Sequence, residues 1–200
     1  MRDAEEAGFD VAWLPDSQFL WRDVWGALTL AAAQTRSIGL GTCVTNLETR
    51  HPSVTAAAAG SVEELAPGRV ILGIGSGDSA VKTLGLKPTN LTRMREQIGI
   101  LRTLLAGGAA EFEGRALAVK AAKRPVPIYV AATGPKMQAL AGELADGVIV
   151  VTGSSPTSSV PRSRASPRAR SARAGASRTS TSASAPTRTS HPIAARRLGS

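Results

Sequence analysis

The chain has 200 residues and a net charge of +9 that belongs to its last quarter, where residues 153–200 hold nine arginines and no acidic residue. Residues 1–152 carry no formal net charge, and the chain is 42% hydrophobic. A segment of this length and composition can bury one hydrophobic core. The single cysteine excludes an internal disulfide, no apolar run reaches the ~20 residues that span a bilayer, and no signal peptide opens the chain, which predicts a cytoplasmic protein without a membrane segment.

Five short apolar runs predict buried strands, and four stretches between them have helical periodicity. The predicted strands are residues 11–14, 38–44, 70–74, 127–131 and 147–151. The predicted helices are residues 24–34, 52–65, 94–105 and 135–144, and residues 4–9 resemble the end of one more. Strands that are apolar on both faces and alternate with helices predict a parallel sheet with crossover helices.

The predicted fold class is therefore α/β, either a doubly wound sheet or a partial (β/α)8 TIM barrel of about five strands. A complete barrel has eight strands in about 250 residues, whereas here the composition changes after the fifth. We expect residues 1–152 to form an incomplete barrel, truncated at both ends, and residues 153–200 to be a disordered tail rich in Arg, Ser, Ala and Pro. A shift of reading frame near Ser154 in a GC-rich gene would explain the tail.

The carboxyl ends of the predicted strands should meet at one mouth, because the loops of parallel α/β folds converge there. These ends offer small, polar and glycine-rich residues, and only Asp16 and Asp78 are acidic. Neither a metal-ligand set nor a nucleophile with a base and an orienting group is present among them. This pattern indicates that a bound cofactor supplies the chemistry.

Several of these segments also have a purely structural interpretation. Residues 131–135 fit either a phosphate seat at a helix N-terminus or a tight turn into that helix. The glycines of residues 73–77 have the wrong spacing for a dinucleotide fingerprint and no helical pattern follows at once, so we interpret them as close backbone packing. Asp16 is equally suited to N-cap the next helix, Cys43 to be a buried apolar residue, and His51 to be a capping or packing residue.

Five motifs in this order resemble the luciferase-like flavin-dependent oxidoreductases, in particular the branch that uses coenzyme F420 and is typified by methylenetetrahydromethanopterin reductase. The motifs are residues 4–10 (AEEAGFD), 16–23 (DSQFLWRD), 41–52 (GTCVTNLETRHP), 68–75 (GRVILGIG) and 134–137 (GPKM), and the resemblance covers residues 1–152. It implies a (β/α)8 barrel, a luciferase-like monooxygenase domain, and a non-prolyl cis peptide bond between Cys43 and Val44 in a bulge behind the flavin ring.

The resemblance also implies hydride transfer between a bound flavin or deazaflavin and an organic substrate, with coenzyme F420 as cofactor and FMN as the alternative. The implied catalytic residues are Asp16 and Ser17, and the implied cofactor-binding residues are Asp16, Cys43, Val44, Thr45, Asn46, Gly75, Gly77, Asp78, Ala132, Thr133 and Gly134. Dehydrogenases of this family carry a histidine base directly after the aspartate. Ser17 occupies that place here, which favours reduction of an activated carbon or imine over base-assisted alcohol oxidation.

The expected partner is a small-molecule substrate, and a homodimer is compatible with the resemblance. Two other interpretations compete with an active enzyme. One is a catalytically inactive fragment, because the missing strands would complete the barrel and much of the substrate pocket. The other is nucleic-acid binding through the basic tail, against which the tail's lack of aromatic stacking residues argues.

Overall fold

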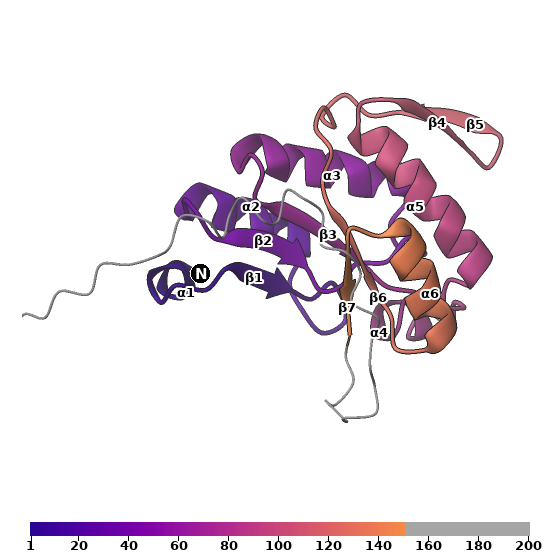
Figure 1. Cartoon of the computed structure of the whole chain (residues 1–200), viewed down its shortest axis with the longest axis horizontal. Helices are drawn as coiled ribbons and strands as arrows, with labels where there is room; N and C mark the ends of the chain where they lie inside the picture. Colours follow the sequence, from indigo (N-terminus) through magenta and orange to yellow (C-terminus); the bar gives the residue numbers. More distant parts are fainter. Residues whose placement is uncertain (151–200) are drawn as a thin grey trace, which may run out of the picture. The chain divides into compact units, whose positions relative to one another are not determined.

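Five parallel strands form one curved sheet in the computed structural model, which describes residues 1–150 (Figure 1). They are β1 (Val11–Leu14), β2 (Gly39–Thr42), β3 (Val70–Ile74), β6 (Ile128–Ala131) and β7 (Gly147–Ile149), and they pair in this order. Every pairing is parallel, as predicted. The expected tail at residues 153–200 and the frame shift lie outside the described residues.

Four helices form a row along one side of this sheet, each packed against the next (Figure 1). They are α2 (Val24–Gln34), α3 (Pro52–Leu65), α5 (Leu91–Leu105) and α6 (Pro135–Leu144). Side-chain caps fix three of their starts: Asp23 accepts from the Gly26 amide in α2, His51 from the Ser53 amide in α3, and Asn90 from the Arg93 amide in α5. All four predicted helices and the capping role of His51 are thus confirmed.

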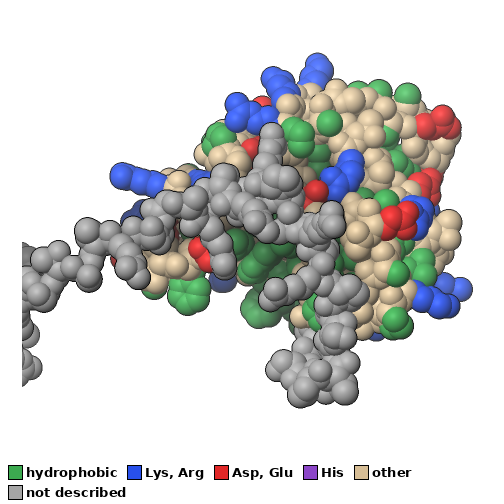
Figure 2. Space-filling view, in the orientation of Figure 1, with side chains coloured by type: hydrophobic (Ala, Val, Ile, Leu, Met, Phe, Trp, Pro, Cys, Tyr) green, Lys and Arg blue, Asp and Glu red, His purple; other side chains and the backbone are tan. Residues whose placement is uncertain are grey.

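The hydrophobic core lies between the helices and the sheet. Alternate residues of β3, namely Val70, Leu72 and Ile74, are buried on this side, together with Leu28 of α2 and Leu101 of α5. Because each strand contributes every second side chain to this layer, the glycines and half-buried residues between them lie on the opposite, concave face. In Figure 2, hydrophobic side chains gather in the middle of the described part, with charged side chains of both signs around them.

The sheet curves strongly around its concave face. The rings of Trp13 on β1 and Tyr129 on β6 have centroids 5.8 Å apart, although β2 and β3 separate these two strands. Three strand spacings in a flat sheet would span about 14 Å. Sequential order, parallel pairing and this curvature together make the wall of a partial (β/α)8 barrel, which confirms the predicted fold class.

The structure corrects the predicted elements in four places. A hairpin of β4 (Ala109–Phe112) and β5 (Arg115–Ala118) follows α5 and was not predicted. A short helix, α4 (Ser79–Lys82), follows the glycine run where no helix was expected, and α1 spans Arg2–Glu6 instead of residues 4–9. The second strand stops at Thr42, because the chain changes course at the next peptide bonds. Within residues 1–150, the helices are all too short or too polar to cross a membrane.

Candidate active site

A cavity of about 450 Å³ opens at the carboxyl ends of β1, β2, β3 and β6. Ten of the twelve predicted site residues line it: Asp16, Ser17, Cys43, Val44, Thr45, Asn46, Gly75, Gly77, Asp78 and Thr133. Ala132 is fully buried behind the wall, and Gly134 lies beyond the lining as the N-cap of α6. The predicted convergence of the strand ends therefore holds, while the binding role of each residue stays a prediction.

Asp16 joins the end of β1 to the loop after β2. Its Oδ2 atom accepts a hydrogen bond from Thr45 Oγ1 at 2.6 Å and from Arg50 Nε at 2.8 Å, and its Oδ1 atom accepts from Arg50 Nη2 at 3.1 Å. The N-cap of α2 is Asp23, so the capping interpretation of Asp16 is wrong. Although burial works in the opposite direction, the bonds to Asp16 and Asp23 raise the pKa of Arg50 above its ordinary value.

A cis peptide bond joins Cys43 to Val44, as the resemblance implied. The backbone after it is fastened to β3, because the Thr45 amide donates to Gly73 O and the Gly75 amide donates to Thr45 O, both at 2.9 Å. A Cβ atom on Gly75 would lie 2.6 Å from Val44 Cγ2. This glycine thus allows the bulge to approach β3, which supports the close-packing interpretation of the glycine run.

Cys43 and His51 are poor candidates for catalysis. Burial raises the pKa of the half-buried Cys43 thiol, so the thiol stays protonated at neutral pH. His51 is the only histidine within residues 1–150, and its ring caps α3 and meets the edge of Phe112 with centroids 5.2 Å apart. Across the part of the chain that the structure describes, no group of three or more His, Cys, Asp or Glu residues could hold a metal ion.

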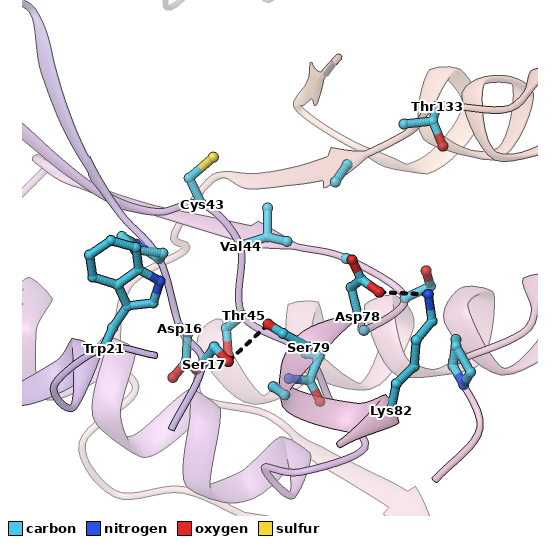
Figure 3. Close-up of a pocket in the computed structure, with 18 residues that line it drawn as sticks. Asp16, Ser17, Trp21, Cys43, Val44, Thr45, Asp78, Ser79, Lys82 and Thr133 are labelled. Carbon is cyan, nitrogen blue, oxygen red and sulfur yellow. Dashed lines mark hydrogen bonds and ion pairs between the residues drawn. The ribbon is translucent and has the colours of Figure 1, made fainter. Parts of the chain in front are cut away.

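The short helix α4 forms a wall that the sequence did not predict. Ser79 donates to Ser17 Oγ at 2.9 Å, and Gln18 Nε2 donates to Ala80 O at 3.1 Å, so α4 is tied to the loop after β1. Lys82 forms an ion pair with Asp78 at 2.6 Å. Figure 3 shows Trp21 and the Asp78–Lys82 pair on opposite sides of the cavity, with Val44 between them. An Asp and a Lys four positions apart were the available signal for this helix.

The charges at the cavity are compensated by protein partners. Asp16 is paired with Arg50, and Asp78 with Lys82. What remains toward the cavity are hydroxyls, main-chain groups and the faces of Trp21 and Val44. Such a site suits a flat, largely uncharged ring with a few hydrogen-bonding atoms. Among the described residues, the carboxylates that line it, Asp16 and Asp78, are both paired with cations and neither is free to act as a general base beside Ser17.

Comparison with known proteins identifies the lineage of this site. A family model for luciferase-like monooxygenases matches residues 1–196, past residue 152, where we expected the resemblance to end. The 5,10-methylenetetrahydromethanopterin reductase of Archaeoglobus fulgidus is 42% identical over 156 residues, covering 74% of this chain and 46% of that protein. An F420-dependent glucose-6-phosphate dehydrogenase of Beutenbergia cavernae is 38% identical over 169 residues, covering 75% and 50%.

A solved structure agrees with these relatives. The coenzyme F420-dependent tetrahydromethanopterin reductase from Methanopyrus kandleri superimposes with a TM-score of 0.65 at 33% identity, over 74% of this chain and 49% of that one. The chain thus spans about half the length of the curated relatives it matches. The family model covers nearly the whole chain, and the curved parallel sheet with its cis peptide bond agrees with it. The chain belongs to the luciferase-like monooxygenase family.

Proposed function

We propose that residues 1–152 carry the cofactor site of an oxidoreductase that transfers hydride between coenzyme F420 and an organic substrate. The observation that carries this proposal is the Cys43–Val44 bulge, fastened to β3 and facing a cavity whose charges are already paired. Two of the relatives named above, the Beutenbergia cavernae dehydrogenase and the Methanopyrus kandleri reductase, are F420-dependent by their names, which favours F420 over FMN. A homodimer is part of the same proposal.

The residues present fit such a ring. A side chain on Gly75 would push against Val44 and fill the wall, so the backbone itself forms the surface there. We assign Cys43 and Val44 to the back of the ring, Asp16 to its edge, and Thr133 and Gly134 to the phosphate of its side chain. When bound, the deazaflavin accepts or delivers the hydride. The protein's own residues hold the ring in one orientation and exclude water from its buried face.

Ser17 determines the direction of chemistry that we favour. Ser17 is 6% exposed, and its hydroxyl accepts a hydrogen bond from Ser79. The hydroxyl is therefore not paired with a base that could remove a substrate proton. Reduction of an activated carbon or imine needs no such base before hydride arrives. We therefore propose reduction of such a substrate in preference to oxidation of an alcohol.

Fluorescence titration tests the proposal. The purified 200-residue chain should bind F420 with micromolar affinity, seen as quenching of the F420 fluorescence, and should bind FMN more weakly. Gly75→Leu should abolish the quenching, because the new side chain would occupy the wall beside Val44. Gly99→Leu is the matched control, since Gly99 faces open space on α5 and should bind F420 as the wild type does.

The competing inactive fragment predicts a different pattern. If a cooperatively melting wild-type protein quenches neither F420 nor FMN, the oxidoreductase proposal fails. Quenching by the wild type that Gly75→Leu leaves intact would also contradict it, because binding would then lie elsewhere.

A further inference from the structure

Arg50 links the cavity wall to the start of α2 through a chain of hydrogen bonds. One side of its guanidinium binds both oxygens of Asp16, and Nη2 also bonds Asp23 Oδ2 at 2.7 Å. Asp23 in turn accepts from the Gly26 amide at 2.8 Å, which fixes the first turn of the helix. Thr45 completes the chain on the other side through its 2.6 Å bond to Asp16. The network therefore spans the ends of β1 and β2 and the beginning of α2.

The Asp16 carboxylate is largely saturated by this network. Its side chain is 6% exposed, and a carboxylate offers about four acceptor positions, of which two on Oδ2 and one on Oδ1 are taken by described residues. A bidentate arginine fixes both the direction and the plane of a carboxylate. One acceptor position on Oδ1 has no partner among residues 1–150, and Asp16 lines the cavity.

Arg50 can influence that cavity only indirectly. Asp16 and Thr45 line the cavity, whereas Arg50 approaches Asp16 from behind and does not belong to the lining among residues 1–150. Its side chain is 23% exposed, so water competes little with the pair. A buried carboxylate that loses its cation is left as an uncompensated charge, which is strongly destabilising, so it must turn toward water or take up a proton.

We propose that Arg50 is a positioning residue: it holds Asp16 as a fixed hydrogen-bond acceptor at the cavity wall, and Asp16 transfers no proton during turnover. This inference rests on the proposed function, because it concerns how the ring is held. It replaces the catalytic role that the family resemblance implied for Asp16 with that of an acceptor that orients the ring. Thr45, bonded to the same carboxylate and to β3, keeps that acceptor in register with the Cys43–Val44 bulge.

A double-mutant cycle tests the coupling, with F420 affinity of the full-length protein as the readout. Arg50→Gln and Asp16→Asn should each weaken F420 binding at least about tenfold, and the double variant should be no weaker than either single one, because Arg50 acts through Asp16. The F420 affinity of Arg50→Lys should lie between those of the wild type and Arg50→Gln, because lysine keeps the positive charge but cannot bind both carboxylate oxygens as the guanidinium does. Arg95→Gln removes an exposed ion pair with Glu143 and is the matched control, with affinity unchanged.

Partial rescue of F420 affinity by Arg50→Lys, compared with Arg50→Gln, is a readout that a purely structural role would not move. Two results would overturn the inference while leaving the proposed function intact. One is a double variant whose loss of F420 affinity is the product of the two single losses, and the other is an Arg50→Gln protein with wild-type affinity. If the folded wild type binds neither F420 nor FMN, both fail together. Arg50→Lys keeps the test available if Arg50→Gln does not fold.

Discussion

Replacing Gly73 with Ala tests how closely β2 and β3 approach behind the cavity. An added Cβ atom would fall far inside contact distance of the Thr42 carbonyl oxygen and 3.0 Å from Ile149 Cδ1. The backbone atom that it meets cannot rotate away, so the strands must separate. Three hydrogen bonds would be strained: Thr45 N to Gly73 O at 2.9 Å, Thr42 Oγ1 to Gly73 O at 2.8 Å, and Gly73 N to Thr42 Oγ1 at 2.9 Å.

The expected loss of stability follows from these contacts. Overpacking costs about 1–3 kcal/mol, and each of the three weakened hydrogen bonds about 1 kcal/mol, which gives about 4–6 kcal/mol in total. This is a large share of the ~5–15 kcal/mol that stabilises a typical domain. With a urea m-value of about 2 kcal/mol/M, the unfolding midpoint should fall by about 2–3 M.

Urea unfolding followed by tryptophan fluorescence measures this shift, and Gly99→Ala provides the matched control. Gly99 lies inside α5 with open space around it, so alanine there should stabilise the protein by about 0.5–1 kcal/mol. A Gly73→Ala midpoint equal to that of the wild type would refute the close approach of Gly73 to Thr42.

Two further predictions concern the opposite end of the sheet. Hydrogen bonds from the backbone of Ser37, Ile38 and Arg36 lower the pKa of Glu5 from 4.5 to about 2. The stability that ionised Glu5 contributes to the fold is therefore present above pH 4.5 and is lost as the pH falls toward 2. The thermal midpoint of the wild type should therefore fall more steeply over this range than that of Glu5→Gln, and equal slopes would contradict the assignment. Arg69 donates to the carbonyl oxygens of Ala32, Thr35 and Ile38 at the end of α2, so Arg69→Met should destabilise by about 2–4 kcal/mol in urea unfolding; a loss within error would show that water replaces these bonds.

The main sheet and its helices were predictable because their signals are local. Runs such as Val70 to Ile74 are apolar at every position, and a proline at the first helical position, such as Pro52, marks a helix start. The hairpin β4–β5 lacks this signal. Five of its eight strand residues are exposed, and a sixth, Ala110, is small and only partly buried. Its turn carries one sequence clue, Gly114: in the structure Glu113 and Gly114 both have positive φ, as a tight hairpin turn requires. Helix α4 has only four residues, too few for periodicity to register.

The position of the candidate site was predictable from the rule that strand ends converge, but the hydrogen bonds between its side chains were not. Asp16 and Arg50 are 34 positions apart, and only the fold brings the loops after β1 and β2 together. The same holds for Ser17 and Ser79, 62 positions apart. The Cys43–Val44 cis bond came from the family resemblance, because no composition or spacing rule indicates a cis bond without proline.

The alkylation rate of Cys43 tests most directly whether a redox ring lies against the bulge. Cys43 is the only cysteine of the chain and lines the cavity, and burial raises the pKa of its thiol, so labelling should be slow at neutral pH and accelerate at higher pH. Saturating F420 should slow the labelling at least about tenfold, because the ring would cover the thiol's side of the cavity. A labelling rate that F420 leaves unchanged, while its fluorescence is still quenched, would place the coenzyme elsewhere and contradict the account.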